Sequence, residues 1–315
     1  MKILVTGGAG FIGSNFIIHM LEKYKNYKII CMDKLTYAAN LDNLIKVKDN
    51  LNYKFIQADI SDRETVYKVF EEEKLDMVVN FAAETHVDRS IEKPDVFIQT
   101  NVVGVGVLLD ACVKYGIKRF HQISTDEVYG DIPIEDNMTK LNETSKLNPS
   151  SPYSASKAAA DLLVMSYHRT YKLPVTISRC SNNYGPHQHK EKLIPMVIYR
   201  ISRDEPIPIY GDGRNIREWI YVIEHCEGID IVLHKGVNGE IYNIGTPYSM
   251  SNIELVKKIL DVYGKNYEMI EYVSDRKGHD LRYAMDSSKM YKEFGWKANI
   301  NLDEGIEKMK NLCSK

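Results

Sequence analysis

The chain has 315 residues, enough for one large domain or two moderate ones. Its 41 Lys and Arg residues nearly balance 43 Asp and Glu residues, and the net charge of −2 excludes the strongly basic surface typical of nucleic-acid-binding proteins. No signal-peptide pattern precedes the first apolar run, no window approaches the length that spans a bilayer, and the five cysteines lack metal-ligand spacing. We therefore expect a cytoplasmic protein with reduced thiols, no metal site, and neither nucleic acid nor membrane as a partner.

Short β-branched runs alternate with helix-length amphipathic stretches over residues 1–180. This alternation is typical of repeated βαβ units, whose strands are covered by helices on both faces. We predict an α/β fold with a Rossmann-type, doubly wound parallel sheet. Its strands are expected at residues 3–6, 28–33, 53–57, 77–81, 119–124 and 175–179.

Prolines break the rest of the chain into shorter elements. We expect residues 181–315 to form a smaller, less regular C-terminal lobe. Helices are predicted there at 193–203, 252–263 and 302–312, and strands at 220–222 and 240–244. The polar, proline-containing stretch 131–152 predicts a long loop over the surface or over a site.

A glycine-rich turn follows the first predicted strand. Gly7, Gly10 and Gly13 form a GxxGxxG pattern before a helical run that extends to about residue 23. Glycines permit the tight turn and let backbone N–H groups approach a pyrophosphate at the helix N-terminus, so we predict a dinucleotide site. Asp33 ends the second predicted strand, where an acid accepts hydrogen bonds from an adenosine ribose; this favours NAD, although Lys34 leaves NADP open.

Tyr153 and Lys157 form a YxxxK pair at the start of an Ala-rich helical segment. The i,i+4 spacing puts both side chains on one helix face, where the ammonium could stabilise a phenolate and make Tyr153 a usable base. With Thr125 at the end of an upstream strand, these residues make up a short-chain dehydrogenase triad. A tyrosine and a lysine on a solvated helix face would be the alternative without the dinucleotide turn.

Two carboxylates, Asp126 and Glu127, follow Thr125 directly. Ligands bind outside the carboxyl ends of strands in such sheets, so the pair would lie beside a substrate. One carboxylate could act as acid and the other as base. The alternative is an acidic turn that only caps the next element.

Several segments together resemble the dTDP-glucose 4,6-dehydratase family of extended short-chain dehydrogenases/reductases. The resemblance runs from residue 1 to residue 298, and the acidic pair is its most specific feature. The matching segments are 7–14, 33–37, 81–91, 124–130, 153–157, 180–186, 191–195, 208–211, 242–245 and 275–280. The sequence also departs from the family pattern: Thr85 replaces a Ser, Glu218 replaces an Asp, residues 222–225 differ, and residues 246–249 lack a second Gly and a later Glu.

The resemblance implies a two-lobed enzyme in which residues 1–180 bind NAD and residues 181–315 mainly hold a nucleotide sugar. The implied NAD contacts are Gly7, Gly10, Phe11, Ile12, Gly13, Asp33, Lys34, Leu35, Thr36, Asp59, Ile60, Ala82, Ala83, Thr100, Tyr153, Lys157 and Asn183. The implied substrate contacts are Thr85, Thr125, Asn182, Lys192, Leu193, Pro208, Tyr210, Arg217, Asn252, Asp275, Arg276 and His279. A homodimer built from helices near residues 102–115 and 154–171 is also implied.

The family mechanism implies a catalytic role for each of Thr125, Asp126, Glu127, Tyr153 and Lys157. Tyr153 takes the C4 hydroxyl proton while NAD is transiently reduced, Glu127 takes the C5 proton, and Asp126 protonates the leaving C6 hydroxyl. The expected reaction converts dTDP-glucose to its 4-keto-6-deoxy product and water, as in rhamnose-type deoxysugar biosynthesis. UDP-glucose or an acetamido sugar is the alternative substrate; a 4-epimerase, a decarboxylase or a silent dinucleotide sensor is the alternative function.

Overall fold

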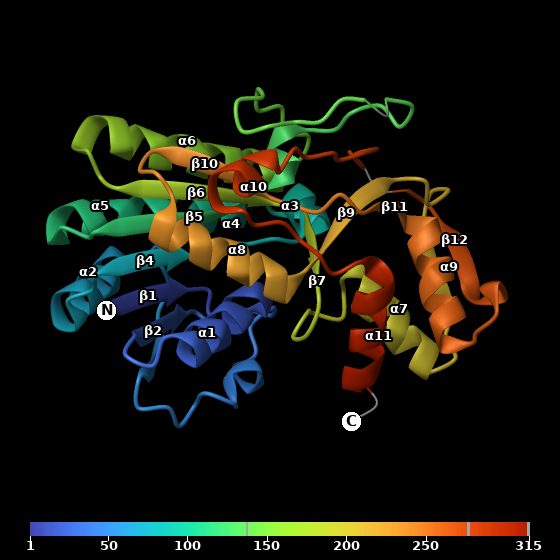
Figure 1. Cartoon of the computed structure of the whole chain (residues 1–315), viewed down its shortest axis with the longest axis horizontal. Helices are drawn as coiled ribbons and strands as arrows, with labels where there is room; N and C mark the ends of the chain where they lie inside the picture. Colours follow the sequence, from blue (N-terminus) through green and yellow to red (C-terminus); the bar gives the residue numbers. More distant parts are fainter. Residues whose placement is uncertain (137, 276–277, 314–315) are drawn as a thin grey trace.

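The computed structural model of the chain describes residues 1–136, 138–275 and 278–313. A seven-stranded parallel sheet forms its larger part, with the strand order β10-β6-β5-β4-β1-β2-β3 (Figure 1). The strands are β1 (Lys2–Thr6), β2 (Lys28–Asp33), β3 (Tyr53–Gln57), β4 (Met77–Asn80), β5 (Arg119–Thr125), β6 (Val175–Cys180) and β10 (Glu240–Ile244). This order reverses direction between β1 and β4, as the doubly wound fold predicted from the sequence requires.

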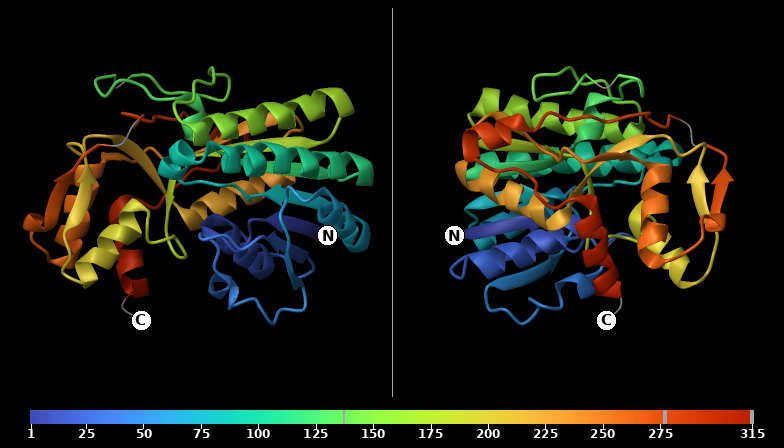
Figure 2. Two further views of the ribbon diagram at one scale, coloured as in Figure 1. Left: turned by 180° about the vertical axis from the view of Figure 1, so that it is seen from behind. Right: turned by 45° about the vertical axis from the view of Figure 1, so that its right-hand side comes forward.

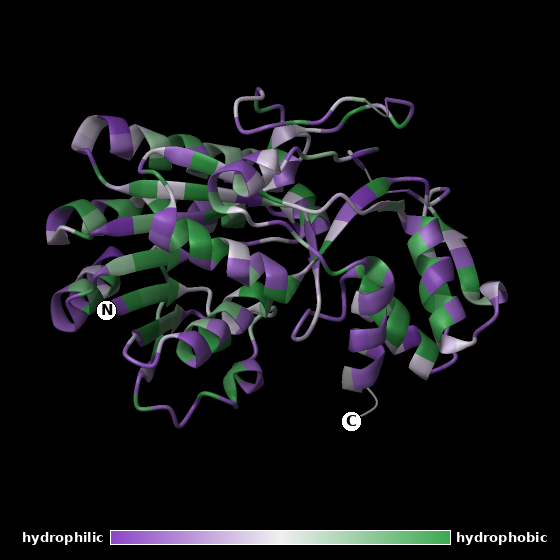
Figure 3. Cartoon of the chain, in the orientation of Figure 1, coloured by the Kyte–Doolittle hydropathy of each residue, from purple (hydrophilic) through white to green (hydrophobic). Residues whose placement is uncertain are grey.

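Helices cover both faces of the sheet, and alternate strand residues enter two separate cores. Ile3 and Val5 point to the core shared with α1 and α8, whereas Leu4 points to the core shared with α2, α5 and α6. Figure 3 shows that the sheet strands are largely hydrophobic, while the helices carry hydrophilic side chains as well. The helices of this part are α1 (Phe11–Lys23), α2 (Arg63–Glu73), α3 (Val87–Glu92), α4 (Pro94–Ile98), α5 (Val105–Tyr115), α6 (Pro152–Tyr171) and α8 (Val222–Lys235), with 3₁₀ turns η1 (Leu41–Leu44) and η3 (Asp126–Tyr129) and a π-helical turn η2 (Gln99–Gly104).

The smaller lobe lies beyond the carboxyl ends of the sheet strands (Figures 1 and 2). Its core packs α7, α9 and α11 against two short sheets, with strand orders β11-β9-β7 and β12-β8. The elements are β7 (Asn182–Tyr184), α7 (Leu193–Ser202), β8 (Ile207–Tyr210), β9 (Ile216–Tyr221), β11 (Ser249–Ser251), α9 (Asn252–Tyr263), η4 (Tyr267–Met269), β12 (Ile270–Val273) and α11 (Leu302–Cys313). Another helix, α10 (Ser288–Phe294), packs back against β10 of the large sheet.

Local sequence signals set the start of α6, which carries Tyr153 and Lys157, and both ends of α9 in the smaller lobe. Ser151 begins α6 through a capping box with Ser154, and Ser251 begins α9 through a capping box with Glu254. Gly264 ends α9 in the left-handed conformation, at φ 63°. These signals place the helix starts independently of tertiary contacts.

The strands predicted in the first half are confirmed to within a residue or two at each end. One placement from the sequence was wrong: the strand at 240–244, expected in the smaller lobe, pairs in parallel with β6 as the edge of the large sheet. The reason is that α8, which the sequence analysis did not identify, carries the chain back along the sheet after β9. The chain therefore returns to the large sheet after its first visit to the smaller lobe.

The expectation that no segment approaches membrane-spanning length was also wrong. Among the described residues, the helical run Pro94–Tyr115 is 22 residues long and apolar enough by composition. However, 56% of its apolar window is buried inside the protein, where α5 packs against α2 and α6. Its apolar composition is thus largely accounted for by the core.

Candidate active site

The glycine turn between β1 and α1 has a shape that side chains would destroy. Gly7 has φ 65°, and a Cβ there would lie 2.6 Å from the backbone nitrogen of Ala82. A Cβ on Gly13 would lie 2.4 Å from the carbonyl oxygen of Gly7. The backbone therefore closes tightly at the start of α1 and leaves its N-terminus facing a cavity, which fits a dinucleotide pyrophosphate.

Asp33 is fixed beside this turn. It is 8% exposed, and its two carboxylate oxygens accept hydrogen bonds from the backbone N–H groups of Ala9 (3.0 Å) and Leu35 (2.8 Å). Burial raises the pKa of this carboxyl, and the two N–H donors oppose that shift. The side chain is thus held at the end of β2, where a ribose would lie.

The ammonium of Lys34 is already engaged by acidic neighbours. Its Nζ donates to Thr100 Oγ1 (3.2 Å) and lies 3.5 Å from Asp59 Oδ2 and 3.7 Å from Glu84 Oε1. Much of its positive charge is therefore balanced within the chain. This arrangement weakens the case for a 2′-phosphate site beside Asp33.

Tyr153 and Lys157 lie in the first turns of α6, 7% and 5% exposed, and face the same cavity. Lys157 Nζ donates to the carbonyl oxygen of Ile123 (2.7 Å), so the ammonium is held over the end of β5. The pKa of Tyr153 is raised well above its usual value, first by burial and then by the charge of Glu127, while a hydrogen bond with Thr125 opposes the shift. For Tyr153 to act as a base, the ammonium of Lys157 and a bound cofactor would have to offset these two causes.

Asp126 and Glu127 occupy the 3₁₀ turn η3 that follows β5. Thr125 caps this turn by accepting the backbone N–H of Glu127 on its hydroxyl oxygen (3.3 Å). Asp126 is 4% exposed, and burial together with the charge of Glu127 raises its pKa to about 7, against the opposing charge of Arg217. Near neutral pH, Asp126 keeps a proton that it can donate, while Glu127 is the more exposed of the two.

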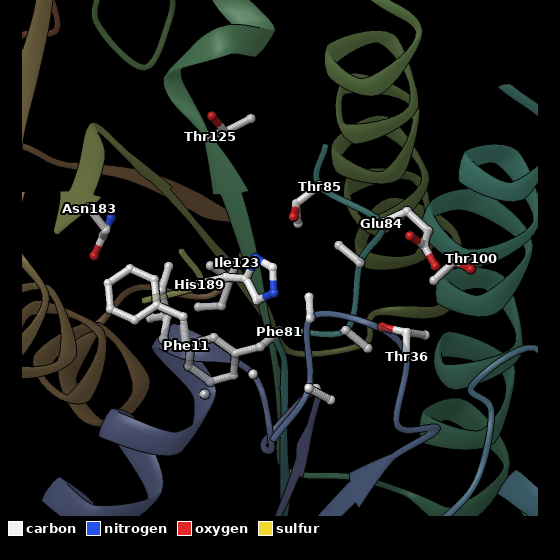
Figure 4. A pocket seen from close by; sticks show the side chains of 18 of the residues that line it. Phe11, Thr36, Phe81, Glu84, Thr85, Thr100, Ile123, Thr125, Asn183 and His189 are labelled. Carbon is white, nitrogen blue, oxygen red and sulfur yellow. The ribbon is translucent and has the colours of Figure 1, made fainter. Parts of the chain in front are cut away.

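A single cavity of about 290 Å³ connects these features. Figure 4 shows lining side chains of this cavity, with Phe11 near the start of α1, Thr100 beside Glu84, and Thr125 at the end of β5. Every catalytic candidate lines it, as do all the cofactor candidates except Leu35, whose side chain packs against the core. Among the substrate candidates, the cavity brings together Thr85, Thr125, Asn182 and Lys192.

The remaining substrate candidates lie outside this cavity in the smaller lobe: Leu193, Pro208, Tyr210, Arg217, Asn252, Asp275 and His279. Arg276 lies outside the described residues. The Arg217 guanidinium, 6% exposed, donates to the carbonyl oxygens of Asp280 (2.8 Å) and Ile216 (2.8 Å) and stacks over the Tyr283 ring. Its charge nevertheless reaches Asp126, so Arg217 lies close to the acidic pair.

Further residues line the cavity that the sequence analysis did not assign. They include Phe81, Glu84, Ile123, Cys180, Gln188, His189 and Glu191. Phe81 follows β4, Cys180 ends β6, and Ile123 lies two residues before the end of β5. The rule that ligands bind at strand ends could therefore have identified them. His189, visible in Figure 4, comes from the loop after β7, and no sequence signal marks it.

No cluster of three or more metal-binding side chains occurs in the part of the chain that the structure describes. Cys31, Cys112, Cys180 and Cys226 are free and buried. The cavity lining includes a carboxyl pair (Asp126 and Glu127), the phenol of Tyr153 and the ammonium of Lys157 beside the glycine turn.

Comparison with known proteins is consistent with this geometry. Residues 4–309 match the model of the family described as GDP-mannose 4,6 dehydratase. The low-salt glycan biosynthesis protein Agl12 of Haloferax volcanii is 49% identical over 98% of this chain and 96% of its own length. A dTDP-glucose 4,6-dehydratase of Escherichia coli is 45% identical over 98% of this chain and 92% of its own length.

Solved structures agree. The crystal structure of dTDP-glucose 4,6-dehydratase from Bacillus anthracis str. Ames in complex with NAD has a TM-score of 0.92 and 45% sequence identity. The similarity covers 100% of this chain and 96% of that one. Fold and sequence therefore point to the same group of enzymes.

Proposed function

We propose that this chain, which belongs to the dTDP-glucose 4,6-dehydratase family and is an NAD-dependent nucleotide-sugar 4,6-dehydratase, acts on dTDP-glucose. The product would be the 4-keto-6-deoxy sugar nucleotide, as in rhamnose-type deoxysugar biosynthesis. The observation that carries the proposal is the adjacent pair Asp126 and Glu127, which faces the same cavity as Tyr153.

The proton chemistry follows from the placement of these side chains. When bound, NAD accepts the hydride from C4 of the sugar and returns it to C6. Tyr153 takes the proton of the C4 hydroxyl, with Thr125 as its hydrogen-bond partner. Because the resulting ketone acidifies C5, Glu127 can take the C5 proton while Asp126, whose pKa is raised to about 7, gives its proton to the leaving C6 hydroxyl.

NAD is held, in this proposal, by the glycine turn, Asp33 and the lining residues of the β1–β4 strand ends. The glycines admit the pyrophosphate because no Cβ fits there. Lys157 keeps its ammonium at the end of β5, where a nicotinamide ribose would lie. Thr85, Asn182 and Lys192, which line the same cavity, would contact the sugar nucleotide.

The substrate is tested by incubating the purified enzyme with a panel of nucleotide sugars and identifying the products by mass. We expect dTDP-glucose to lose one water, with UDP-glucose as a slower substrate. If only an acetamido sugar lost water, the enzyme would still be a 4,6-dehydratase, but dTDP-glucose would not be its substrate. A product of unchanged mass with inverted configuration at C4 would instead identify a 4-epimerase. If the protein bound NAD but converted none of the sugars, it would be a dinucleotide sensor without catalytic activity.

We further propose that the enzyme is a homodimer. Apolar side chains on the outer faces of the α4–η2 segment and of α6 are exposed: Ile98 (52%), Val103 (43%) and Leu162 (62%). Pairing of these faces between two copies would bury them. Leu162→Glu should shift the mass measured by light scattering from dimer to monomer, whereas the surface change Tyr291→Glu in α10 should not.

A further inference from the structure

The segment between β7 and α7 lies against the catalytic cavity, yet the proposed chemistry gives it no role. Gln188, His189 and Glu191 line the cavity, and the ring of His189 is visible in Figure 4. We call residues 186–191 the strap. Both ends of the strap join elements of the smaller lobe, so its contacts with the NAD-binding part of the chain decide how it lies over the site.

The first half of the strap is fixed to α1, the helix that begins at the glycine turn. The side-chain N–H of Asn15 donates to the carbonyl oxygen of Pro186 (2.9 Å), and His187 Nδ1 lies 3.1 Å from Ser14 Oγ. The Ser14 hydroxyl donates its single hydrogen to the carbonyl oxygen of Phe11 (3.0 Å), so the bond with His187 requires a hydrogen on Nδ1. Ser14 and Asn15 are buried and do not line the cavity, so their side chains hold the strap from outside the cofactor site.

The backbone turn that brings His187 to α1 is unfavourable for this residue. His187 has φ 70°, in the left-handed region that costs free energy for residues other than glycine. Gly185, two residues earlier, has φ 146°, and a Cβ there would lie 2.5 Å from Val222 Cγ1 of α8. The conformation of the strap therefore depends on contacts that offset this cost, such as the bond between His187 and Ser14.

The second half of the strap contacts the segments that follow β2 and β4. The His189 ring meets the Tyr37 ring edge-on, with the ring centroids 5.9 Å apart. Glu191 Oε2 lies 3.7 Å from Nε2 of His86, which directly precedes α3. Tyr37 is in turn covered by the guanidinium of Arg89 in α3, 3.5 Å from the ring centroid. Because α1 and the loop after β2 both line the cavity, the strap bridges two of its walls.

The proposed reaction has a particular need for such a bridge. The hydride that NAD accepts from C4 must return to C6 of the same sugar, so the reduced cofactor has to stay bound between the two transfers. Its loss midway would leave a keto sugar that cannot be completed and an enzyme without cofactor. Slow release of the dinucleotide therefore serves this chemistry, and segments that close over a site are a common way to slow release.

We propose that residues 186–191 act as a strap that retains the dinucleotide, and that Ser14 and His187 are positioning residues that keep the strap closed. The strap opens when its contacts with α1 break. Cofactor release and cofactor entry both require this opening, so a weaker anchor should speed both. The need for retention rests on the proposed function, but retention itself is measured with NAD alone.

Retention is tested by the rate at which the NAD-loaded enzyme exchanges its cofactor for isotopically labelled NAD, without any sugar. Ser14→Ala removes the partner of His187 and should raise the rate constant for NAD release about tenfold, the equivalent of one hydrogen bond. The rate constant for association with the NAD-free enzyme should rise as well, so Kd should change less than the release rate. His187→Ala should have a similar effect, and adding Ser14→Ala to it should not speed release further, because the two side chains act through one bond.

Two variants serve as controls. His187→Asn supplies an N–H donor near the position of Nδ1 and tolerates the left-handed backbone conformation, so its release rate should lie close to that of the parent. His19→Ala removes a different contact of α1, with Asp230 of α8 (3.1 Å), and should leave the release rate unchanged. Together they separate an open strap from a general loosening of α1.

Release rates of Ser14→Ala and His187→Ala that match the parent would overturn the inference. Faster release with an unchanged association rate would also overturn it, because these side chains would then act on bound NAD rather than on the opening of the strap. Equally fast release from His19→Ala would have the same consequence, since any loosening of α1 would then suffice. A parent enzyme that dehydrates no nucleotide sugar, with the variants behaving as expected toward NAD, would overturn only the proposed function.

Discussion

The large sheet and the smaller lobe build their parts of the site in different ways. In the large sheet, Asp33, Thr125 and Asp126 stand at or just after the end of a strand, so the parallel register brings them to one edge. In the smaller lobe, Arg217 in β9 is held by the carbonyl oxygen of Asp280, more than sixty residues away in the chain. The sheet therefore positions chemistry through local sequence, whereas the lobe positions binding groups through long-range contacts.

This difference predicts where single substitutions act. Changes at strand ends of the large sheet should stop individual chemical steps and leave the rest of the site in place. Changes in the lobe should affect substrate binding and, through Arg217, the ionisation of the acidic pair. The experiments below separate these two kinds of effect.

The largest effects are expected from Tyr153 and Glu127. Loss of a positioned acid or base typically costs about 10²- to 10⁴-fold in rate. Tyr153→Phe should prevent the first oxidation, so little NADH should form on mixing with substrate. Glu127→Gln should allow oxidation but block C5 deprotonation, so NADH should accumulate.

Rapid-mixing absorbance reports the NADH, and incorporation of solvent deuterium at C5 reports the proton transfer. Asp126→Asn is the informative companion, because it should slow loss of the C6 hydroxyl while C5 exchange continues. If Glu127→Gln kept both C5 exchange and turnover, Glu127 would not be the base, and the pair would be no more than an acidic turn.

In the smaller lobe, Arg217→Ala should raise KM for the nucleotide sugar by about 10- to 100-fold, the equivalent of a hydrogen bond to a charged group. Since Arg217 opposes the rise in the Asp126 pKa, its loss should also move the alkaline limb of kcat to higher pH. Arg217→Lys is the control that keeps the charge without the planar fork. If Arg217→Ala left KM for the nucleotide sugar unchanged and raised KM for NAD, Arg217 would contact the cofactor rather than the substrate.

Substitutions at Asp33 and Lys34, at the edge of the large sheet, should have a smaller effect, which is on the preference for NAD over NADP. Asp33→Asn should weaken NAD binding about tenfold and narrow its advantage over NADP, because the repulsion of a 2′-phosphate is lost. Lys34→Ala should leave the NAD to NADP preference nearly unchanged, since Asp59 and Glu84 already engage that ammonium. Titration of both cofactors by fluorescence measures the ratio, and a preference for NADP in the parent would contradict the assignment.

The same contrast explains what the sequence could predict. The strands of the first half, the glycine turn and the strand-end residues are local features, so periodicity and spacing located them closely. The edge strand β10 was assigned to the smaller lobe instead of the large sheet. Local sequence predicts that a segment is a strand, but the sheet that the strand joins depends on contacts with distant segments. The raised pKa of Glu218 likewise depends on burial created by distant segments, such as the one that carries Met285, whose backbone N–H donates to the Glu218 carboxylate.

The smallest effect concerns stability, and it tests the cost of burying one carboxyl group in each region, Asp126 after β5 and Glu218 in β9. Asp126 and Glu218 have raised pKa values, of about 7 and about 8, so between about pH 4 and pH 8 the folded protein binds more protons than the unfolded chain. The free energy of unfolding must then fall as the pH rises through this window, because the unfolded state gains by ionising both groups.

Glu218→Gln removes one of these two ionisable groups from the folded interior. Its Tm should therefore exceed that of the parent at pH 8 by a few degrees, on the order expected for one to two kcal/mol. The difference should shrink toward pH 5, where both carboxyls are protonated in the folded parent. Differential scanning calorimetry of the NAD-free proteins at both pH values measures this difference. Glu224→Gln is the comparison, because Glu224 is another buried carboxyl residue but accepts the backbone N–H groups of both Asn299 and Ile300. A Glu218→Gln variant less stable than the parent at pH 8 would mean that the Met285 N–H bond to the carboxylate outweighs the cost of burying it, and Glu218 would then be a structural residue of β9.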